Sequence, residues 1–374
     1  MDDVNKKDNS ESKGTMSEQH ITLENSNRCG LITLDRPEAL NALSLDMINP
    51  IKPNYKKWAK DPHIYGVVMQ SAHDRAFCAG ADVRYILWAL EHDKSLIQQY
   101  FKAEYETDWA VCSFFKPTVP LINGYVMGGG IGLSVYGTHF IMAEKAVFAM
   151  PEINLGLFPD VGMSYLLSRL PNHLGTYLAL TGHSLSPSEC YALEIASHTV
   201  RSSDFPKIRN AMHEADPIDT ILDELHQDFG LPAIDQHIPF IKRAFDTDSI
   251  EGIFAKLQEE GEASNSSHKE WATSILKELQ KKSPLSLKIT LRLLQKAKTF
   301  QNLKEALNLD YNLMCHFIES SDFKEGIKST LIDKSYSPTW QHKSIEDVSD
   351  HLIDGYFTFS SPKALDFIDY NIRT

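Results

Sequence analysis

Hydrophobic and polar positions follow one pattern in the first half of the chain and another in the second half. From residue 20 to about residue 205, short runs rich in β-branched residues predict strands, with ITLEN and CGLITLDR as a hairpin and YGVVMQS, VPLINGYV and HFIMAEKAVFAM as further strands. Longer stretches between them, residues 43–59 and 93–112, predict helices. This alternation of strands and helices is typical of an α/β domain.

After Asp216 the apolar residues recur at helical spacing, beginning with Ile218, Ile221, Leu222 and Leu225. Helical patterns continue through WATSILKELQKK, LSLKITLRLLQKA and LKEALNLDYNLMCHFI. The pattern therefore predicts three regions, namely a disordered tail (residues 1–19), an α/β core (20–215) and a mainly α-helical C-terminal region (216–374).

Charge and cysteine content narrow the classes of function. The formal net charge of −13 argues against general binding to nucleic acid or to an anionic membrane, and no apolar run reaches the length of about 20 residues that spans a bilayer. The five cysteines are scattered and include no CxxC pair, so we expect neither a zinc site nor a disulfide framework. The reduced cysteines, and a first segment without signal or presequence features, predict a cytoplasmic location.

A run of glycines, PLINGYVMGGGIG, follows an apolar strand and opens a predicted helix. It matches neither the GxxxxGK[ST] nor the GxGxxG phosphate loop, which leaves close approach to a ligand or a tight strand-to-helix turn. A second loop, AFCAGADV at 76–83, also follows a strand. Two such loops could each supply one amide to a carbonyl oxygen, the usual oxyanion arrangement.

Carboxylates stand close to these glycines in otherwise apolar sequence. Glu152 is either a site residue or an edge residue in solvent, and Asp160 is either a site residue or the cap of the helix that follows. Glu104 lies on or beside the apolar stripe of the helix predicted over 93–112, so it is either the edge of the stripe or an inward-facing acid. Neither Ser134 nor Ser164 lies in GxSxG, and no histidine spacing predicts a metal site.

Four ordered motifs resemble the crotonase (enoyl-CoA hydratase/isomerase) superfamily: LDRPEALNAL at 34–43, FCAGADV at 77–83, NGYVMGGGIGLS at 123–134, and the MPE and FPD pair. The resemblance implies that residues 20–215 form a spiral of ββα turns that binds an acyl-CoA thioester. It also implies that the backbone amides of Ala81 and Gly129 hold the thioester oxygen and that the segment around Arg36 lies near the CoA nucleotide. Coenzyme A would be part of the substrate, and no separate cofactor or metal is implied.

Within this superfamily the chain is most similar to the 3-hydroxyisobutyryl-CoA hydrolases of valine breakdown. Their pattern matches the Glu104–Tyr105 pair and residues 128–137, 150–162 and 322–340, and it implies that Glu104, Gly129, Glu152 and Asp160 line the site, with Glu152 and Asp160 catalytic. Hydratases resemble the chain less, because they carry a catalytic glutamate where this chain has Gly132. Met163 replaces a residue that is usually small in the hydrolases, a difference that could alter the acyl pocket.

These features predict hydrolysis of 3-hydroxyisobutyryl-CoA, or another short 3-hydroxyacyl-CoA, to the free acid and CoA. Glu152 would attack the carbonyl carbon or deprotonate a water that attacks it, and the sequence leaves both roles open. Asp160 would orient the water or accept a hydrogen bond from the 3-hydroxyl, which Glu104 could hold from the opposite wall. Two alternatives remain, an enoyl-CoA hydratase or isomerase and a non-catalytic acyl-CoA-binding subunit. A homo-oligomer is also open, since superfamily members often form trimers.

Overall fold

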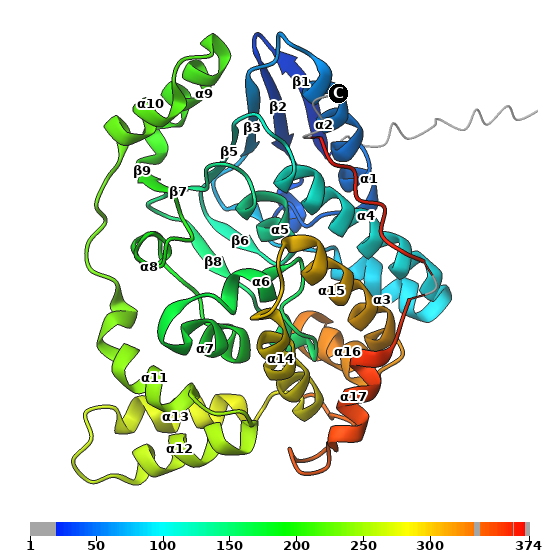
Figure 1. The fold of residues 1–374 in the computed structure, drawn as a ribbon, viewed down its shortest axis with the longest axis vertical. Helices are drawn as coiled ribbons and strands as arrows, with labels where there is room; N and C mark the ends of the chain where they lie inside the picture. The colour runs from blue at the N-terminus through cyan, green and yellow to red at the C-terminus, as the bar shows by residue number, and fades with distance from the viewer. Residues whose placement is uncertain (1–19, 333–336, 362, 371–374) are drawn as a thin grey trace, which may run out of the picture.

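A six-stranded sheet forms the N-terminal part of the computed structural model, which describes residues 20–332, 337–361 and 363–370 (Figure 1). The predicted hairpin is confirmed, because β1 (Ile21–Ser26) and β2 (Cys29–Leu34) pair antiparallel. The other neighbours are parallel, in the order β1-β2-β3-β5-β7-β9. The remaining strands of this sheet are β3 (Gly66–Ser71), β5 (Thr118–Ile122), β7 (Ile141–Ala143) and β9 (His198–Val200).

A second, three-stranded parallel sheet accompanies the first, with the order β4-β6-β8. Its strands are β4 (Ala76–Cys78), β6 (Tyr125–Met127) and β8 (Val147–Ala149). Along the chain, each of β3, β5 and β7 in the larger sheet is followed by a strand of the smaller sheet. The chain thus winds as a spiral of ββα turns, and the predicted fold is confirmed.

Two segments that the sequence predicts as single strands are each divided between the two sheets. VPLINGYV forms β5 and β6, with the break at Asn123 and Gly124. Gly124 has a φ of +69°, and a Cβ at this position would lie 2.4 Å from the carbonyl oxygen of Arg75. A side chain would therefore clash with backbone at the turn that carries the chain from one sheet to the other. HFIMAEKAVFAM likewise forms β7 and β8.

Helices between the strands position the loops at the ends of the smaller sheet. The helix predicted over 43–59 is two helices, because Pro50 cannot continue the first one. The helix predicted over 93–112 is confirmed as α4, and Asp93 caps it by accepting the amide of Ser95 at 2.9 Å. The α-helices of this part are α1 (Leu45–Ile48), α2 (Ile51–Lys60), α3 (Val83–His92), α4 (Lys94–Cys112), α5 (Gly129–Val135), α6 (Met163–Leu167), α7 (Leu174–Thr181) and α8 (Pro187–Ala192).

After β9 the described chain is helical, as the sequence predicts. Its α-helices are α9 (Phe205–Glu214), α10 (Ile218–Leu225), α11 (Ile238–Phe245), α12 (Ile250–Glu262), α13 (Lys269–Leu279), α14 (Pro284–Ala297), α15 (Leu303–Phe317), α16 (Ser321–Ile327) and α17 (Asp350–Thr358). A π-helix over Lys328–Ile332 follows α16, and short 3₁₀ helices cover Pro37–Ala39, Glu152–Leu155, Pro171–His173, Ser202–Asp204 and Ala233–His237. None of the described helices is long and apolar enough to cross a bilayer.

The two faces of the larger sheet belong to two hydrophobic cores. Val67 and Met69 of β3 point into the main core, whereas Val68 between them packs with α9 and α10 on the other face. This alternation follows from the two-residue period of a strand. Because both faces are covered, the parallel strands read as continuous apolar runs in the sequence.

The C-terminal segment, residues 363–370, runs back along α4 toward α2 (Figure 1). Lys52 Nζ donates to the carbonyl oxygen of Asp366 at 3.2 Å, and Trp109 Nε1 donates to Asp369 Oδ1 at 3.0 Å. The Tyr370 hydroxyl donates to the carbonyl oxygen of Lys52 at 3.2 Å. The C-terminal segment thus bonds to α2 through Lys52 and to α4, the helix that carries Glu104, through Trp109. The predicted tail, residues 1–19, and part of the late 322–340 motif lie outside the described residues.

Candidate active site

A cavity of about 280 Å³ lies where the glycine loops, α4 and the Glu152–Leu155 turn meet. Ala81, Glu104, Gly129, Glu152 and Asp160 all line it. The fold thus brings together predicted site residues that are up to 79 positions apart in the sequence, from Ala81 to Asp160. Leu155, Leu157, Phe101 and Phe323 supply apolar walls. This combination of apolar lining with a few convergent polar groups is typical of a small-molecule site.

One candidate amide donor comes from Ala81. In the parallel bridge between Leu43 and Ala81, Leu43 donates to the carbonyl oxygen of Gly80 at 2.8 Å and accepts the amide of Asp82 at 3.0 Å. The amide of Ala81 itself therefore points away from Leu43. This amide donates to no group among the residues that the structure describes, and Ala81 lines the cavity, so the amide is a candidate donor to a ligand oxygen.

The other candidate amide belongs to Gly129, the first residue of α5. As the first amide of the helix it has no intrahelical acceptor, and Gly128, which precedes it at a φ of +47°, offers no side-chain cap. Glycine is required by close approach, since a Cβ on Gly129 would lie 2.0 Å from Glu104 Oε1 and one on Gly128 would lie 2.7 Å from Glu152 Oε1. The glycine run therefore brings backbone close to two carboxylates.

Arg36 is bonded to the loop that carries Ala81. Its Nη1 donates to Asp82 Oδ2 at 2.8 Å and to the carbonyl oxygen of Ala42 at 3.0 Å. Arg36 is not among the residues that line the cavity. The ion pair between Arg36 and Asp82 supports the Ala81 loop. The position of the CoA nucleotide near Arg36 stays a prediction.

Glu104 and Glu152 both lie inside the protein, with 2% and 8% of their surface exposed. The interpretations of Glu152 as an edge residue in solvent and of Glu104 as the edge of an apolar stripe are therefore wrong. Glu152 Oε2 and Glu104 Oε1 are buried and accept no hydrogen bond from any described residue. Burial, reinforced by the neighbouring Asp160 carboxylate, raises the pKa of both glutamates well above the ordinary value.

Asp160 is held by Tyr105 and does not cap a helix. The Tyr105 hydroxyl donates to Asp160 Oδ2 at 2.6 Å, whereas α6 begins only at Met163 and has no side-chain cap. The capping interpretation of Asp160 is therefore wrong. Burial raises the pKa of Asp160 to about 6, and the hydrogen bond from Tyr105 opposes the rise. Consecutive residues of α4 thus reach different groups, Glu104 the Gly129 backbone and Tyr105 the Asp160 carboxylate.

Sequence reasoning missed two further buried carboxylates, Asp108 on α4 and Asp310 on α15. Burial and the charge of Asp160 raise the pKa of both well above the ordinary value. For each of them the helical spacing of the sequence indicates an inward-facing position. Asp108 lies one helical turn after Glu104 on the same face, and Asp310 interrupts an apolar stripe formed by Leu303, Ala306, Leu307 and Met314.

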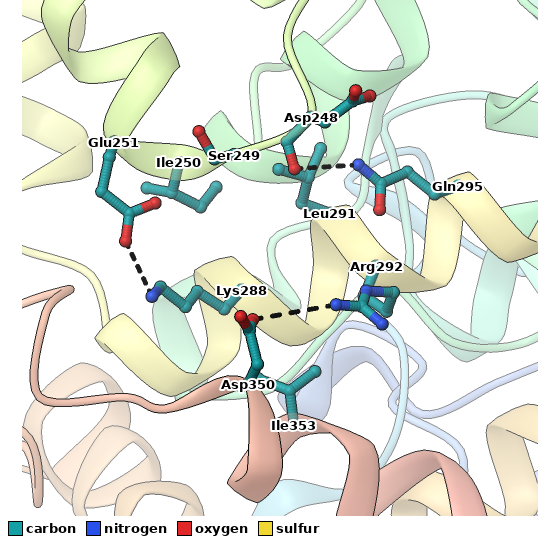
Figure 2. Close-up of a pocket in the computed structure, with 10 residues that line it drawn as sticks. All are labelled: Asp248, Ser249, Ile250, Glu251, Lys288, Leu291, Arg292, Gln295, Asp350 and Ile353. Atoms are coloured by element: carbon teal, nitrogen blue, oxygen red, sulfur yellow. Dashed lines mark hydrogen bonds and ion pairs between the residues drawn. The ribbon is translucent and has the colours of Figure 1, made fainter.

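A second hollow, between α12, α14 and α17, has a different character (Figure 2). Lys288 pairs with Glu251 at 2.7 Å, and Arg292 pairs with Asp350 at 3.8 Å. Its cations are thus already neutralised by neighbouring carboxylates, and none of the predicted site residues lines it. Among the described residues no cluster of histidine, cysteine and acidic side chains has a geometry suited to a metal ion.

Comparison with known proteins shows the family of the chain. The family described as enoyl-CoA hydratase/isomerase matches residues 29–357. The chain belongs to this family. It is 38% identical to the mitochondrial 3-hydroxyisobutyryl-CoA hydrolase of Gallus gallus, over 92% of the chain and 90% of that protein. Its identity to the mitochondrial 3-hydroxyisobutyryl-CoA hydrolase of Homo sapiens is 37%, with the same shares covered.

Two solved structures share the fold. A carnitinyl-CoA dehydratase from Mycobacterium thermoresistibile is 28% identical, with a TM-score of 0.86 over 93% of this chain and 99% of that one. An enoyl-CoA hydratase from Rhodobacter sphaeroides 2.4.1 is 32% identical, with a TM-score of 0.84 over 93% of this chain and 100% of that one. The fold thus extends to chains named for hydration or dehydration as well as for hydrolysis, and the site residues must distinguish these reactions.

Gly132 stands where the resemblance to hydratases implies a catalytic glutamate. A Cβ at Gly132 would lie 2.7 Å from Asp108 Oδ2 and 2.7 Å from Val161 Cβ. Here the space beside α5 that a side chain would enter is taken by Asp108 and Val161. Met163 is fully buried next to Tyr136 and is not among the residues that line the cavity, so the structure gives no sign that it shapes the acyl pocket.

We expect Gly132→Ala to lower the free energy of unfolding by about 1–3 kcal/mol, because overpacking against two fixed groups outweighs the helix propensity of alanine. Thermal unfolding would measure the change. Gly355→Ala is the matched control, since a Cβ at this position in α17 meets nothing within 4 Å and should leave stability unchanged or raise it. Equal melting temperatures for the two variants would contradict the close contact at Gly132.

Proposed function

We propose that this protein hydrolyses 3-hydroxyisobutyryl-CoA to 3-hydroxyisobutyrate and CoA, as a step of valine breakdown. The observation that carries the proposal is the cavity that Ala81, Gly129 and three buried carboxylates line together, while the Gly132 position has no room for a further acid. The names of relatives more than 35% identical over nine tenths of the chain support the choice of substrate.

In the proposed mechanism the amides of Ala81 and Gly129 polarise the thioester carbonyl and stabilise the oxyanion that develops on it. Glu152 either attacks the carbonyl carbon or removes a proton from the attacking water. Burial raises the pKa of Glu152, so its ionised carboxylate is a stronger base than that of an exposed glutamate. When Glu152 acts as the base, the water oxygen bonds to the carbonyl carbon, the C–S bond breaks, and the proton that Glu152 took up passes to the departing CoA sulfur. When Glu152 attacks directly, it displaces the CoA thiolate to form an acyl-glutamyl anhydride, which water then hydrolyses.

Asp160 and Glu104 are proposed to act on the acyl chain and the water. Asp160, oriented by Tyr105, accepts a hydrogen bond from the attacking water or from the 3-hydroxyl of the substrate. Glu104 reaches the same space from α4, beside Gly129. A substrate without the hydroxyl would leave a buried carboxyl group unpaired in the complex, and such a loss is costly.

The proposal also covers the position of coenzyme A, the domain boundaries, the assembly and the location of the protein. Coenzyme A enters as part of the substrate, with its nucleotide near the segment around Arg36, and no separate cofactor or metal takes part. We also propose that the tail ends at residue 19 and that the boundary between the α/β core and the helical region lies after residue 215. A homo-oligomeric assembly is a further proposal. A cytoplasmic location stays a proposal, since the relatives are named as mitochondrial proteins.

Enoyl-CoA hydration or isomerisation is the second candidate, favoured by the names of the two solved structures. Hydration needs acid–base work at both carbons of the double bond. Gly132 supplies no group for this work at the position where hydratases have a glutamate. A non-catalytic acyl-CoA-binding subunit is the third candidate, and the retention of Glu104, Glu152 and Asp160 in one cavity argues against it.

The test compares three thioesters by release of the free CoA thiol. We expect kcat/KM for isobutyryl-CoA, which lacks the 3-hydroxyl, to fall at least about 100-fold below that for 3-hydroxyisobutyryl-CoA. 3-Hydroxypropionyl-CoA keeps the hydroxyl and lacks one methyl group, so its kcat/KM should fall by a smaller factor. Equal rates for isobutyryl-CoA and 3-hydroxyisobutyryl-CoA would show that no group in the cavity recognises the hydroxyl.

A further inference from the structure

The backbone directly after Asp160 adopts an unusual conformation. Val161 has a φ of +50° and Gly162 a φ of +76°, and α6 begins at the next residue. A β-branched residue such as valine rarely enters the left-handed region, because its side chain crowds the backbone there. Such a conformation persists only where neighbouring groups hold it in place.

Three hydrogen bonds hold this turn. The amide of Gly162 donates to Asp310 Oδ2 at 2.7 Å, and the Tyr136 hydroxyl donates to the carbonyl oxygen of Val161 at 2.9 Å. The amide of Met163 donates to the carbonyl oxygen of Asp160 at 2.9 Å. Of these, only the bond to Asp310 comes from the C-terminal helical region, and it joins positions 148 residues apart.

Asp310 carries this contact at an energetic cost. It lies on α15 with none of its surface exposed, and its other oxygen, Oδ1, has no hydrogen-bond partner among the described residues. A leucine or methionine would suit the apolar stripe of α15 better on packing grounds alone. The acid therefore serves a purpose other than packing.

We propose that Asp310 is a positioning residue for the reaction: by accepting the Gly162 amide it holds the left-handed Val161–Gly162 turn and thereby fixes the Asp160 carboxylate in the cavity. The inference rests on the proposed thioesterase function for its effect on turnover. Its structural part, the restraint of the turn, can be tested without any substrate. Asp310 itself does not line the cavity, so it acts only through the turn.

Two substitutions separate the hydrogen bond from the charge. Asp310→Ala removes the acceptor, and we expect kcat for 3-hydroxyisobutyryl-CoA to fall between about 10-fold and 100-fold with KM nearly unchanged, as is typical when a reacting group is slightly misplaced. Asp310→Asn keeps an acceptor oxygen, so it should restore kcat to within about threefold of the unmodified protein. The control is Glu189→Ala, which likewise removes a buried carboxylate that accepts a distant backbone amide, that of Ile234 at 3.0 Å, and should leave kcat unchanged.

Hydrogen exchange measured by mass spectrometry on peptides that contain residues 160–163 provides the second readout. Exchange there should rise in Asp310→Ala, return to the original level in Asp310→Asn and stay unchanged in Glu189→Ala. Unchanged exchange and kcat in Asp310→Ala, or an equal loss in both Asp310 variants, would overturn the inference. If the unmodified protein releases no CoA thiol, the proposed function fails instead, and the exchange of residues 160–163 still decides whether Asp310 holds the turn.

Discussion

Replacing Glu152 with glutamine should lower the turnover of 3-hydroxyisobutyryl-CoA at least about 100-fold while the protein remains folded. Glutamine keeps the shape of the side chain and removes both the nucleophile and the base. Folding should survive, because Glu152 Oε2 accepts no hydrogen bond from any described residue and a neutral amide is less costly to bury than a carboxylate. Stopped-flow or steady-state release of CoA thiol would measure the rate, and circular dichroism would confirm folding.

Glu106→Gln is the control for this variant. Glu106 lies on α4, two positions after Glu104, but it pairs with Lys52 at 2.7 Å and with Lys102 and does not line the cavity. Its replacement should leave turnover unchanged. Hydrolysis near the original rate by a folded Glu152→Gln protein would remove Glu152 from the mechanism.

Replacing Asp160 with asparagine should also lower turnover, by about 10-fold to 100-fold, without loss of thermal stability. The amide keeps an acceptor for the Tyr105 hydroxyl but loses the negative charge that would orient the water or bind the 3-hydroxyl. Because Asp160 makes no capping contact to α6, no helix cap is lost. Full activity in this variant would exclude Asp160 from the chemistry.

The stability of the same variant should depend on pH in a defined direction. The pKa of Asp160 is raised from 3.8 to about 6, so the folded state binds the proton more tightly than the unfolded state. The stability that this proton provides is full below about pH 4 and is lost as pH rises to about 6. Above pH 6, Asp160→Asn should therefore be the more stable protein by up to about 3 kcal/mol, and the difference should shrink toward pH 4. Unfolding in urea at pH 5 and pH 8 would measure it.

Local patterns in the sequence predict most of the elements. The hairpin follows from runs of β-branched residues, α4 and the C-terminal helices follow from longer stretches and helical spacing, and the glycine run predicts the turn into α5. The division of VPLINGYV and HFIMAEKAVFAM between two sheets does not follow from periodicity. Both halves of each segment are apolar, and only the packing of successive spiral turns decides which sheet each half joins.

Site residues that lie in sequence motifs could be predicted, whereas residues whose roles depend on contacts between distant elements could not. Glu152 and Ala81 could be placed by the motifs around them, and both line the cavity. The roles of Asp108 and Asp310 depend on the approach of α4 and α15 to Gly132 and Gly162, which no local pattern encodes. The ion pair between Arg36 and Asp82 was likewise not predictable from the motif around Arg36, and the position of the CoA nucleotide near this segment stays a prediction.

The most direct way to distinguish hydrolysis from hydration is to assay one purified sample of the protein with two substrates. Release of CoA thiol would be followed with 3-hydroxyisobutyryl-CoA, and loss of the conjugated enoyl absorbance would be followed with crotonyl-CoA. Thioester hydrolysis needs the two amides and one activated attacking group, all of which line the cavity, whereas Gly132 offers no side chain to the double bond. We expect rapid thiol release and at most trace hydration. Efficient hydration without thiol release would contradict the account, and tight binding of both thioesters without turnover would identify a non-catalytic binding subunit.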